Sequence, residues 1–203
     1  MCRFGVRLTL FLALSYLARA ESPLTVLLEF EQPHSTQSLL EMEKETQHIL
    51  KPSGLKLEWR FKESLSQSES FNDVVVVRMT GQCRMDAFPV LLDERGPLAF
   101  THSSDGEVLP FSEVLCDKVR RSVQGALKPA YPQDADKLYG RALGRVLAHE
   151  MFHMVARTNT HGKRGVAKTA LSGPQLIGDD LPLDNHEVTE LKTILESRGG
   201  KGR

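Results

Sequence analysis

The sequence offers little that suits binding to nucleic acid or insertion into a membrane. Its 203 residues carry 26 Lys plus Arg against 26 Asp plus Glu, and aromatic residues make up only 6%. No dense basic run is interleaved with aromatic residues, so we expect no nucleic-acid partner. The most apolar stretch, residues 8–17, is about ten residues long, roughly half of what a bilayer-spanning helix requires. No later stretch is longer or more apolar, and we expect no membrane-spanning helix after it.

That N-terminal stretch has the composition of a secretory signal peptide. Arg3 and Arg7 precede the apolar run, and Ala18-Arg19-Ala20 supplies the small-x-small pattern at which signal peptides are cleaved. A membrane anchor is the alternative, but the run is short for one. We therefore expect residues 1–20 to be removed and the protein to be exported, so that it is secreted or periplasmic.

The rest of the chain, residues 21–203, has the length of a single domain with its own core, and it contains no internal repeat. Cysteine is scarce: Cys2 lies in the signal peptide, so only Cys83 and Cys116 remain. In an exported chain such a pair favours a disulfide over two buried thiols. Neither cysteine belongs to a Cys-x-x-Cys pair, so we do not expect them to bind zinc. We expect the protein to be a monomer.

Short apolar runs with strand character alternate with helical patterns, which predicts an α+β fold. The β-branched run at 73–79 suits a central strand that is covered on both faces. Asp105-Gly106 is a strong hairpin signal, and Pro97 and Pro110 indicate edge or bulged positions because proline cannot donate to a ladder. In chain order we expect strand 24–30, helix 35–50, strands 55–61, 73–79, 97–102 and 107–119, helix 134–156, and a C-terminal helix after Asp184.

The long helix at 134–156 has the composition of a buried helix. Gly140, Gly144 and Ala148 recur every four residues, and such a stripe of small side chains would let the helix press closely against a sheet. Apolar residues surround most of its second half, as in a helix with little solvent-exposed face. Asp134 or Asp136 is available as its N-cap.

Near the end of this helix the sequence HEMFH places two histidines four residues apart. On a helix His149 and His153 lie about 40° apart in projection and about 6 Å apart along the axis, so both imidazoles can bind one tetrahedral ion. Glu150 lies about 100° around from His149, where its carboxylate can act as a general base. The alternative is a chance pattern of core histidines, but two histidines and a glutamate in an apolar helix are costly without partners. A zinc ion supplies those partners.

A catalytic zinc site usually takes a third protein ligand and leaves the fourth position for water. His161 is the first histidine after the motif, but twelve residues beyond His149 it would lie about 18 Å further along a continuous helix. The chain must therefore turn back after Ala156. A downstream acid, Glu187 or Asp180, is the alternative third ligand. With Asp184 three residues before it, Glu187 also forms the pattern of a capping box.

These residues resemble the zincin metallopeptidases, and the metzincin clan in particular. The resemblance implies a twisted mixed sheet with an antiparallel edge strand, packed on a long active-site helix. It also implies zinc on His149, His153 and His161, with Glu150 as the general base. The chain departs from the clan's pattern at Ala156 and Asn159, where glycine and the third histidine are usual. No methionine follows Met154, so the segment 167–176 would have to form the turn beside the metal without one.

The resemblance implies an exported, zinc-dependent endopeptidase that acts on peptides or proteins. The edge strand would hold the substrate as an added strand, through Leu98, Ala99, Phe100 and Thr101. One alternative is a secreted zinc-binding or peptide-capturing protein of the same fold without turnover. Another is an adhesive domain without a metal, in which the motif is incidental.

Overall fold

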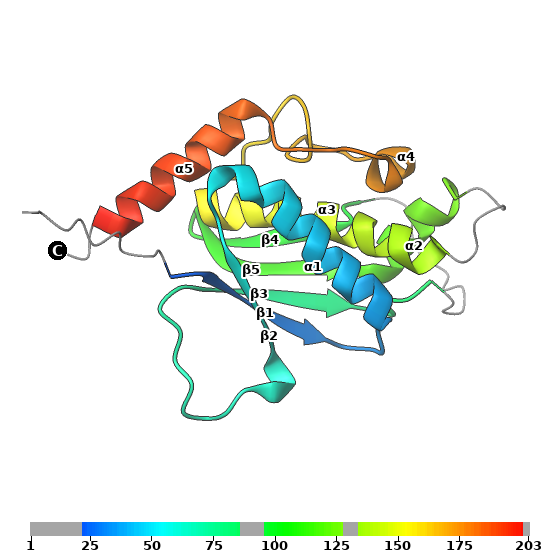
Figure 1. The fold of residues 1–203 in the computed structure, drawn as a ribbon, viewed down its shortest axis with the longest axis horizontal. Coiled ribbons are helices and arrows are strands. Elements are labelled where there is room, and N and C mark those ends of the chain that lie inside the picture. Colours follow the sequence, from blue (N-terminus) through cyan, green and yellow to red (C-terminus); the bar gives the residue numbers. More distant parts are fainter. Residues whose placement is uncertain (1–21, 86–95, 128–133, 201–203) are drawn as a thin grey trace, which may run out of the picture.

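A five-stranded sheet with helices on one of its faces organises the molecule (Figure 1). The computed structural model describes residues 22–85, 96–127 and 134–200, so the expected signal peptide lies outside the described residues. No helix among them is long and apolar enough to cross a membrane. In chain order the elements are β1 (Leu24–Phe30), α1 (Thr36–Leu50), η1 (Lys51–Ser53), β2 (Leu57–Phe61), η2 (Lys62–Ser64), β3 (Val74–Thr80), β4 (Ala99–Ser104), β5 (Glu107–Leu115), α2 (Cys116–Gln124), α3 (Ala135–Ala156), α4 (Gly173–Ile177) and α5 (Asn185–Gly200).

The sheet is mixed, and β4 forms one of its edges. The strand order is β2-β1-β3-β5-β4, in which β4 is antiparallel to β5 and the other neighbours are parallel. Asp105 and Gly106 both have positive φ, 52° and 82°, as a two-residue type I′ turn requires. The β4–β5 register shifts between Thr101 and Ser103, opposite the part of β5 that contains Pro110. The hairpin and the bulged proline are therefore confirmed, and the fold agrees with the expected α+β class.

Only one face of the central strand β3 is fully buried, so the expectation that both faces are covered was wrong. Val75, Val77 and Met79 are buried, whereas the alternate residues Val74 and Val76 are half-buried. The reason is that α1, α2 and α3 all lie on one side of the sheet (Figure 1). A continuous β-branched run thus does not require two covered faces.

Gly140 and Gly144 of α3 face another helix rather than the sheet, which corrects the expectation for this part of the stripe. A Cβ atom on Gly140 would collide with Ser38 of α1, and one on Gly144 would lie 2.8 Å from the carbonyl oxygen of Met42. Thr46 of α1 uses this close approach and donates its hydroxyl to the Gly144 carbonyl at 3.1 Å. Close packing on α1 therefore fixes the axial position of α3, and with it the position of the histidine motif.

The start of α3 also differs in detail from the expected cap. Asp134 occupies the N-cap position but its side chain makes no capping hydrogen bond. The Asp136 carboxylate instead accepts hydrogen bonds from the hydroxyls of Ser35 and Ser38, at 3.0 and 3.2 Å. These bonds join the beginnings of α1 and α3.

The segment after β5 is helical, and the expected strand 107–119 ends at Leu115. Residues from Cys116 onward form α2, in which Cys116, Val119, Arg120 and Val123 are buried. Their spacing of three and four residues is helical. This signal was present in the sequence but was assigned to the strand before it.

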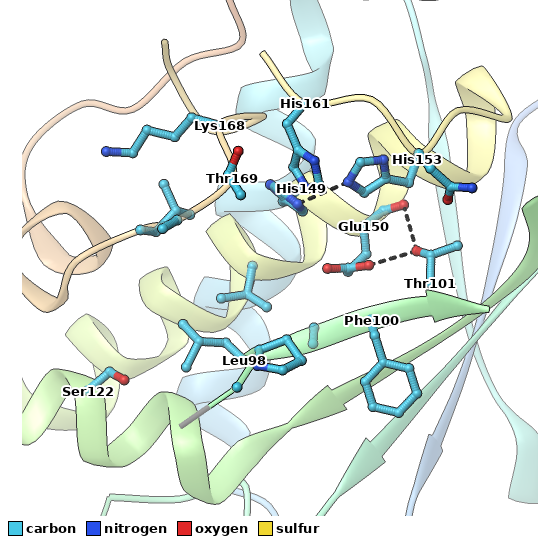
Figure 2. Close-up of a pocket in the computed structure, with 17 residues that line it drawn as sticks. Leu98, Phe100, Thr101, Ser122, His149, Glu150, His153, His161, Lys168 and Thr169 are labelled. Atoms are coloured by element: carbon cyan, nitrogen blue, oxygen red, sulfur yellow. Dashed lines mark hydrogen bonds between the residues drawn. The ribbon is translucent and has the colours of Figure 1, made fainter. Parts of the chain in front are cut away.

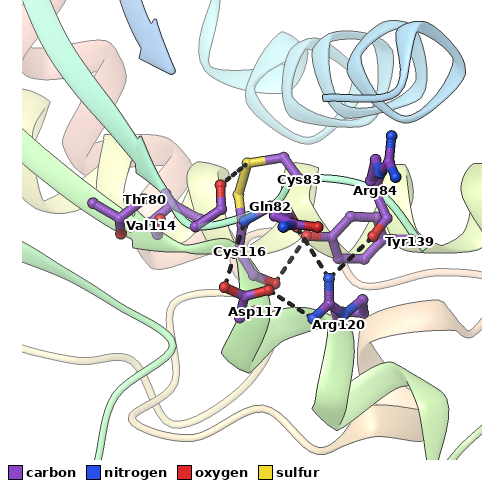
Figure 3. The surroundings of a disulfide bond; sticks show 10 residues. Thr80, Gln82, Cys83, Arg84, Val114, Cys116, Asp117, Arg120 and Tyr139 are labelled. Atoms are coloured by element: carbon purple, nitrogen blue, oxygen red, sulfur yellow. Dashed lines mark hydrogen bonds and ion pairs between the residues drawn. A yellow bond between two sulfur atoms is a disulfide. The ribbon is translucent and has the colours of Figure 1, made fainter. Parts of the chain in front are cut away.

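The two cysteines form a disulfide, as expected, between the segment after β3 and the first residue of α2 (Figure 3). Their Cα atoms are 5.0 Å apart. Beside the bond, Arg120 pairs with Asp117 at 2.7 Å, and Tyr139 of α3 donates its hydroxyl to the Cys116 carbonyl at 2.8 Å. The start of α2 is thus tied covalently to the end of β3 and by a hydrogen bond to α3.

Candidate metal centre and cleft

Three histidines converge at the end of α3 (Figure 2). His149 and His153 lie on the last turns of the helix, which ends at Ala156 because Arg157 adopts a left-handed conformation, with φ 52°. The chain then turns back and brings His161 to the other two rings, with centroid distances of 5.1 Å to His149 and 4.7 Å to His153. One nitrogen of each ring lies within 4.8 Å of the others. The expected turn after the helix is therefore present.

The hydrogen bonds of the first two histidines fix which ring nitrogens are free. The Nδ1 atom of His149 lies 2.9 Å from the Val166 carbonyl oxygen, and that of His153 lies 2.7 Å from the Thr158 carbonyl oxygen. A carbonyl oxygen can only accept, so each Nδ1 carries the hydrogen and, in the neutral ring, each Nε2 carries a lone pair. The two Nε2 atoms are 3.0 Å apart. Two lone pairs at this distance require a shared cation or an added proton.

Burial favours the neutral form of these rings and thus a metal over a proton. The pKa of His149 is lowered to about 4, chiefly by burial and to a smaller extent by the neighbouring His153 and His161, while the Val166 carbonyl acts in the opposite direction. Burial also lowers the pKa of His153. A tetrahedral ion at the usual distance of about 2.1 Å places its ligand nitrogens about 3.4 Å apart. The observed separations, from 3.0 Å to at most 4.8 Å, therefore suit one metal ion with three ligands.

Glu150 lies beside the histidines and is held by the edge strand. Its Oε2 accepts a 2.7 Å hydrogen bond from the hydroxyl of Thr101 on β4. The residue is only 4% exposed. Burial raises its pKa to about 7, against the hydrogen bonds from Thr101 and Ser112, which favour the charged form. A carboxylate that titrates near neutral pH can both accept and return a proton.

The raised pKa of Glu150 predicts that Glu150→Gln stabilises the metal-free protein at pH 8. Because the pKa is about 7 in the folded state and about 4.3 in an unfolded chain, the cost of burying the charge is absent below about pH 4, grows between about pH 4 and 7, and is fully present above about pH 7. The neutral glutamine avoids this cost, so we expect a gain of roughly 3 kcal/mol in unfolding free energy at pH 8 that disappears near pH 4. Thermal unfolding of both metal-free proteins at the two pH values measures it, and a gain independent of pH would contradict this origin.

A cleft of about 580 Å³ extends from the histidines along β4 (Figure 2). Residues 96–101 line one side, residues 168–171 line the other, and Val146, one turn before the first histidine, also contributes. Ser122 of α2 lies far from the histidines in the same cleft (Figure 2). The structure thus brings all four expected substrate-binding residues, Leu98 to Thr101, to the cleft, although the ring of Phe100 points away from it. Their role in binding a substrate stays a prediction.

Neither acidic alternative joins the histidine group. Asp180 is exposed between α4 and α5. Glu187 is buried at the start of α5, where a Cβ atom on Gly162 would lie 3.1 Å from its carboxyl carbon. In the described part of the chain its Oε2 has no hydrogen-bond partner and Asp184 accepts a hydrogen bond from the Asn185 amide, so no capping box between Asp184 and Glu187 is formed there. Within the described residues, His149, His153 and His161 are the one group of three or more potential ligands that lie close enough for a metal ion.

Several residues that shape the centre were not found from the sequence. The carbonyl groups of Thr158 and Val166 belong to the backbone, and no residue type encodes their role. Thr101 was expected to contact substrate, but its hydrogen bond to Glu150 could not be seen without the sheet register. Ser122 of α2 lines the cleft only because tertiary packing brings α2 there, and no local sequence pattern indicates this.

The chemistry of the centre is thus that of three neutral imidazoles beside a buried carboxyl group. It suits a metal ion bound by three nitrogen ligands. Comparison of the chain with known proteins finds no matching family model, no matching curated protein and no matching solved structure.

Proposed function

We propose that the protein is an exported, zinc-dependent endopeptidase. The observation that carries the proposal is the pair of Nε2 lone pairs 3.0 Å apart, with a third histidine beside them and Glu150 next in the chain. His149, His153 and His161 would hold the ion. Bound there, zinc would act as a Lewis acid that lowers the pKa of water towards about 7.

Glu150 moves the proton in this proposal. With its pKa near 7 it takes a proton from the attacking water and later returns it to the leaving amine. Thr101 holds the Oε2 atom, which fixes the orientation of the carboxyl group towards the cleft. Because Thr101 belongs to the strand along which the substrate would lie, the same strand positions both the base and the peptide.

The edge strand β4 provides the surface for an extended peptide. Among the residues that the structure describes it pairs with β5 alone, so its other side presents backbone groups to the cleft. A peptide added as a further strand would bind through main-chain hydrogen bonds, which place little demand on sequence. Selectivity would then come from side-chain pockets such as the part of the cleft that extends towards Ser122.

The proposal is tested by zinc content and proteolysis of the protein without residues 1–20. We expect about one zinc ion per chain, cleavage of an unstructured protein such as casein, loss of cleavage on removing the metal with a chelator, and recovery on adding zinc. One zinc per chain without cleavage would instead indicate the zinc-binding or peptide-capturing protein. If the purified protein contained no metal and neither chelator nor added zinc changed its properties, the HEMFH motif would be incidental and would not form a metal site.

A further inference from the structure

A buried arginine lies one turn before the first metal-ligand histidine. Arg145 of α3 is 1% exposed. Its Nε donates to Glu45 of α1 at 2.7 Å, and its Nη1 donates to the backbone carbonyl of Gln175 in α4 at 2.6 Å. Burying a cation is costly unless it is paired and hydrogen-bonded. The guanidinium therefore joins three helices at a site that tolerates little displacement.

Gln175 connects Arg145 to the wall of the cleft, because its backbone and its side chain bond to different partners. While its backbone is held by Arg145, its side-chain Oε1 accepts hydrogen bonds from the Lys168 ammonium at 2.7 Å and from the Ser172 amide at 3.1 Å. Residues 168–171 line the cleft opposite β4. Gln175 thus links the buried arginine to Lys168 at the start of that wall and to Ser172 directly after it.

The two residues directly before Lys168, Val166 and Ala167, orient the proposed metal ligands. The buried Val166 supplies the carbonyl that holds Nδ1 of His149. Next to it, Ala167 accepts a 2.9 Å hydrogen bond from the amide of Gly162, which follows His161. A shift of these two residues would therefore disturb the orientation of His149 and the position of the chain that carries His161.

We propose that Arg145 is a positioning residue for the metal centre, acting through Gln175 on the segment 166–175. It touches neither metal nor substrate. Partners that orient a histidine ligand contribute to metal affinity, typically about 10–100-fold when lost. Arg145 acts on such a partner, the Val166 carbonyl, through Gln175 and Lys168. The inference rests on the proposed metal site, but not on peptidase activity.

The test compares three variants without residues 1–20. Arg145→Lys keeps the charge but loses the planar fork that bonds in two directions. Gln175→Ala keeps the backbone carbonyl and frees Lys168 and Ser172. Arg141→Lys is the matched control, because Arg141 lies one turn earlier on α3 and also donates to two carbonyls at the end of α4. These belong to Ile177 and to the C-cap residue Gly178, which are not part of the link to the cleft wall.

We expect the zinc dissociation constant, measured by competition with a chromophoric chelator, to rise about tenfold in Arg145→Lys and Gln175→Ala. In Arg141→Lys it should stay within about twofold of wild type. The visible absorption of bound Co²⁺ should change in the first two variants and not in the control, which general destabilisation would not produce.

Unchanged zinc affinity and Co²⁺ absorption in a folded Arg145→Lys would overturn the proposal, as would an equal loss in Arg141→Lys. If Arg145→Lys does not fold, unchanged zinc affinity and Co²⁺ absorption in Gln175→Ala would overturn the proposal. Wild-type protein that binds zinc without hydrolysing peptides would end the proposed function and leave this inference standing, provided the variants differ as expected. Wild-type protein that binds no zinc would end both.

Discussion

Replacement of Glu150 by glutamine is expected to slow peptide hydrolysis by about 10²–10⁴-fold, the usual contribution of a general acid–base group, while the chain keeps one zinc ion. Glutamine has nearly the same shape and can still accept the hydrogen bond from Thr101. It cannot take a proton from water. Since no ligand nitrogen is changed, zinc content should stay near one ion per chain, and the loss should fall on kcat.

Steady-state cleavage of a fluorogenic peptide and zinc content of the same samples measure this effect. Glu113→Gln is the matched control. It also removes a carboxylate, but Glu113 lies on the neighbouring strand β5 and does not line the cleft. It should retain activity within a few-fold of wild type. Wild-type activity in Glu150→Gln would remove Glu150 from the mechanism, and loss of zinc in that variant would mean that its carboxylate supports the metal site.

The stability prediction for Glu150→Gln complements this kinetic effect. If the replacement lowers activity but stabilises the metal-free protein at pH 8, then Glu150 serves catalysis and lowers the unfolding free energy. This cost to stability arises because burial removes the Glu150 carboxylate from water. Bound metal would supply a compensating positive charge, so zinc should reduce the difference in stability between wild type and variant.

The sequence predicted the parts of the site that depend on local periodicity. His149, Glu150 and His153 are brought together by a single helix, and helical spacing alone defines their geometry. The hairpin at Asp105-Gly106 and the bulge at Pro110 are also local, because each follows from backbone preferences of one or two residues.

The parts that were wrong or missed depend on neighbours far away in the chain. Whether Val76 is covered depends on which side of the sheet the helices occupy. Gly140 could have packed on a sheet or on a helix, and only the presence of α1 decides. The capping pattern at Glu187 was correct as a pattern, but this side chain packs against the turn at Gly162 instead. Arg145 gave no sequence signal, since its two acceptors lie 100 residues earlier and 30 residues later.

His161→Ala is expected to abolish tight zinc binding and, with it, hydrolysis. His161 is exposed and the turn that carries it lies outside α3, so the folded structure should tolerate alanine there. The site would be reduced to two nitrogens, and the loss of affinity should exceed the about 10–100-fold that is typical when a partner of a ligand is lost. Apparent dissociation constants for zinc, measured by competition with a chelator, test this.

Two acidic variants separate the possible third ligands. Glu187→Gln and Asp180→Asn should keep zinc affinity close to that of wild type, because neither carboxylate lies with the three histidines. His102→Ala serves as the histidine control, since His102 bonds to Glu113 and does not line the cleft. If zinc affinity survived in His161→Ala and fell in Glu187→Gln, the chain after α3 would have to rearrange on binding the ion, with the orphaned Glu187 oxygen as the third ligand. If it fell only in His161→Ala, the turn after Ala156 would be the feature that completes the metal site.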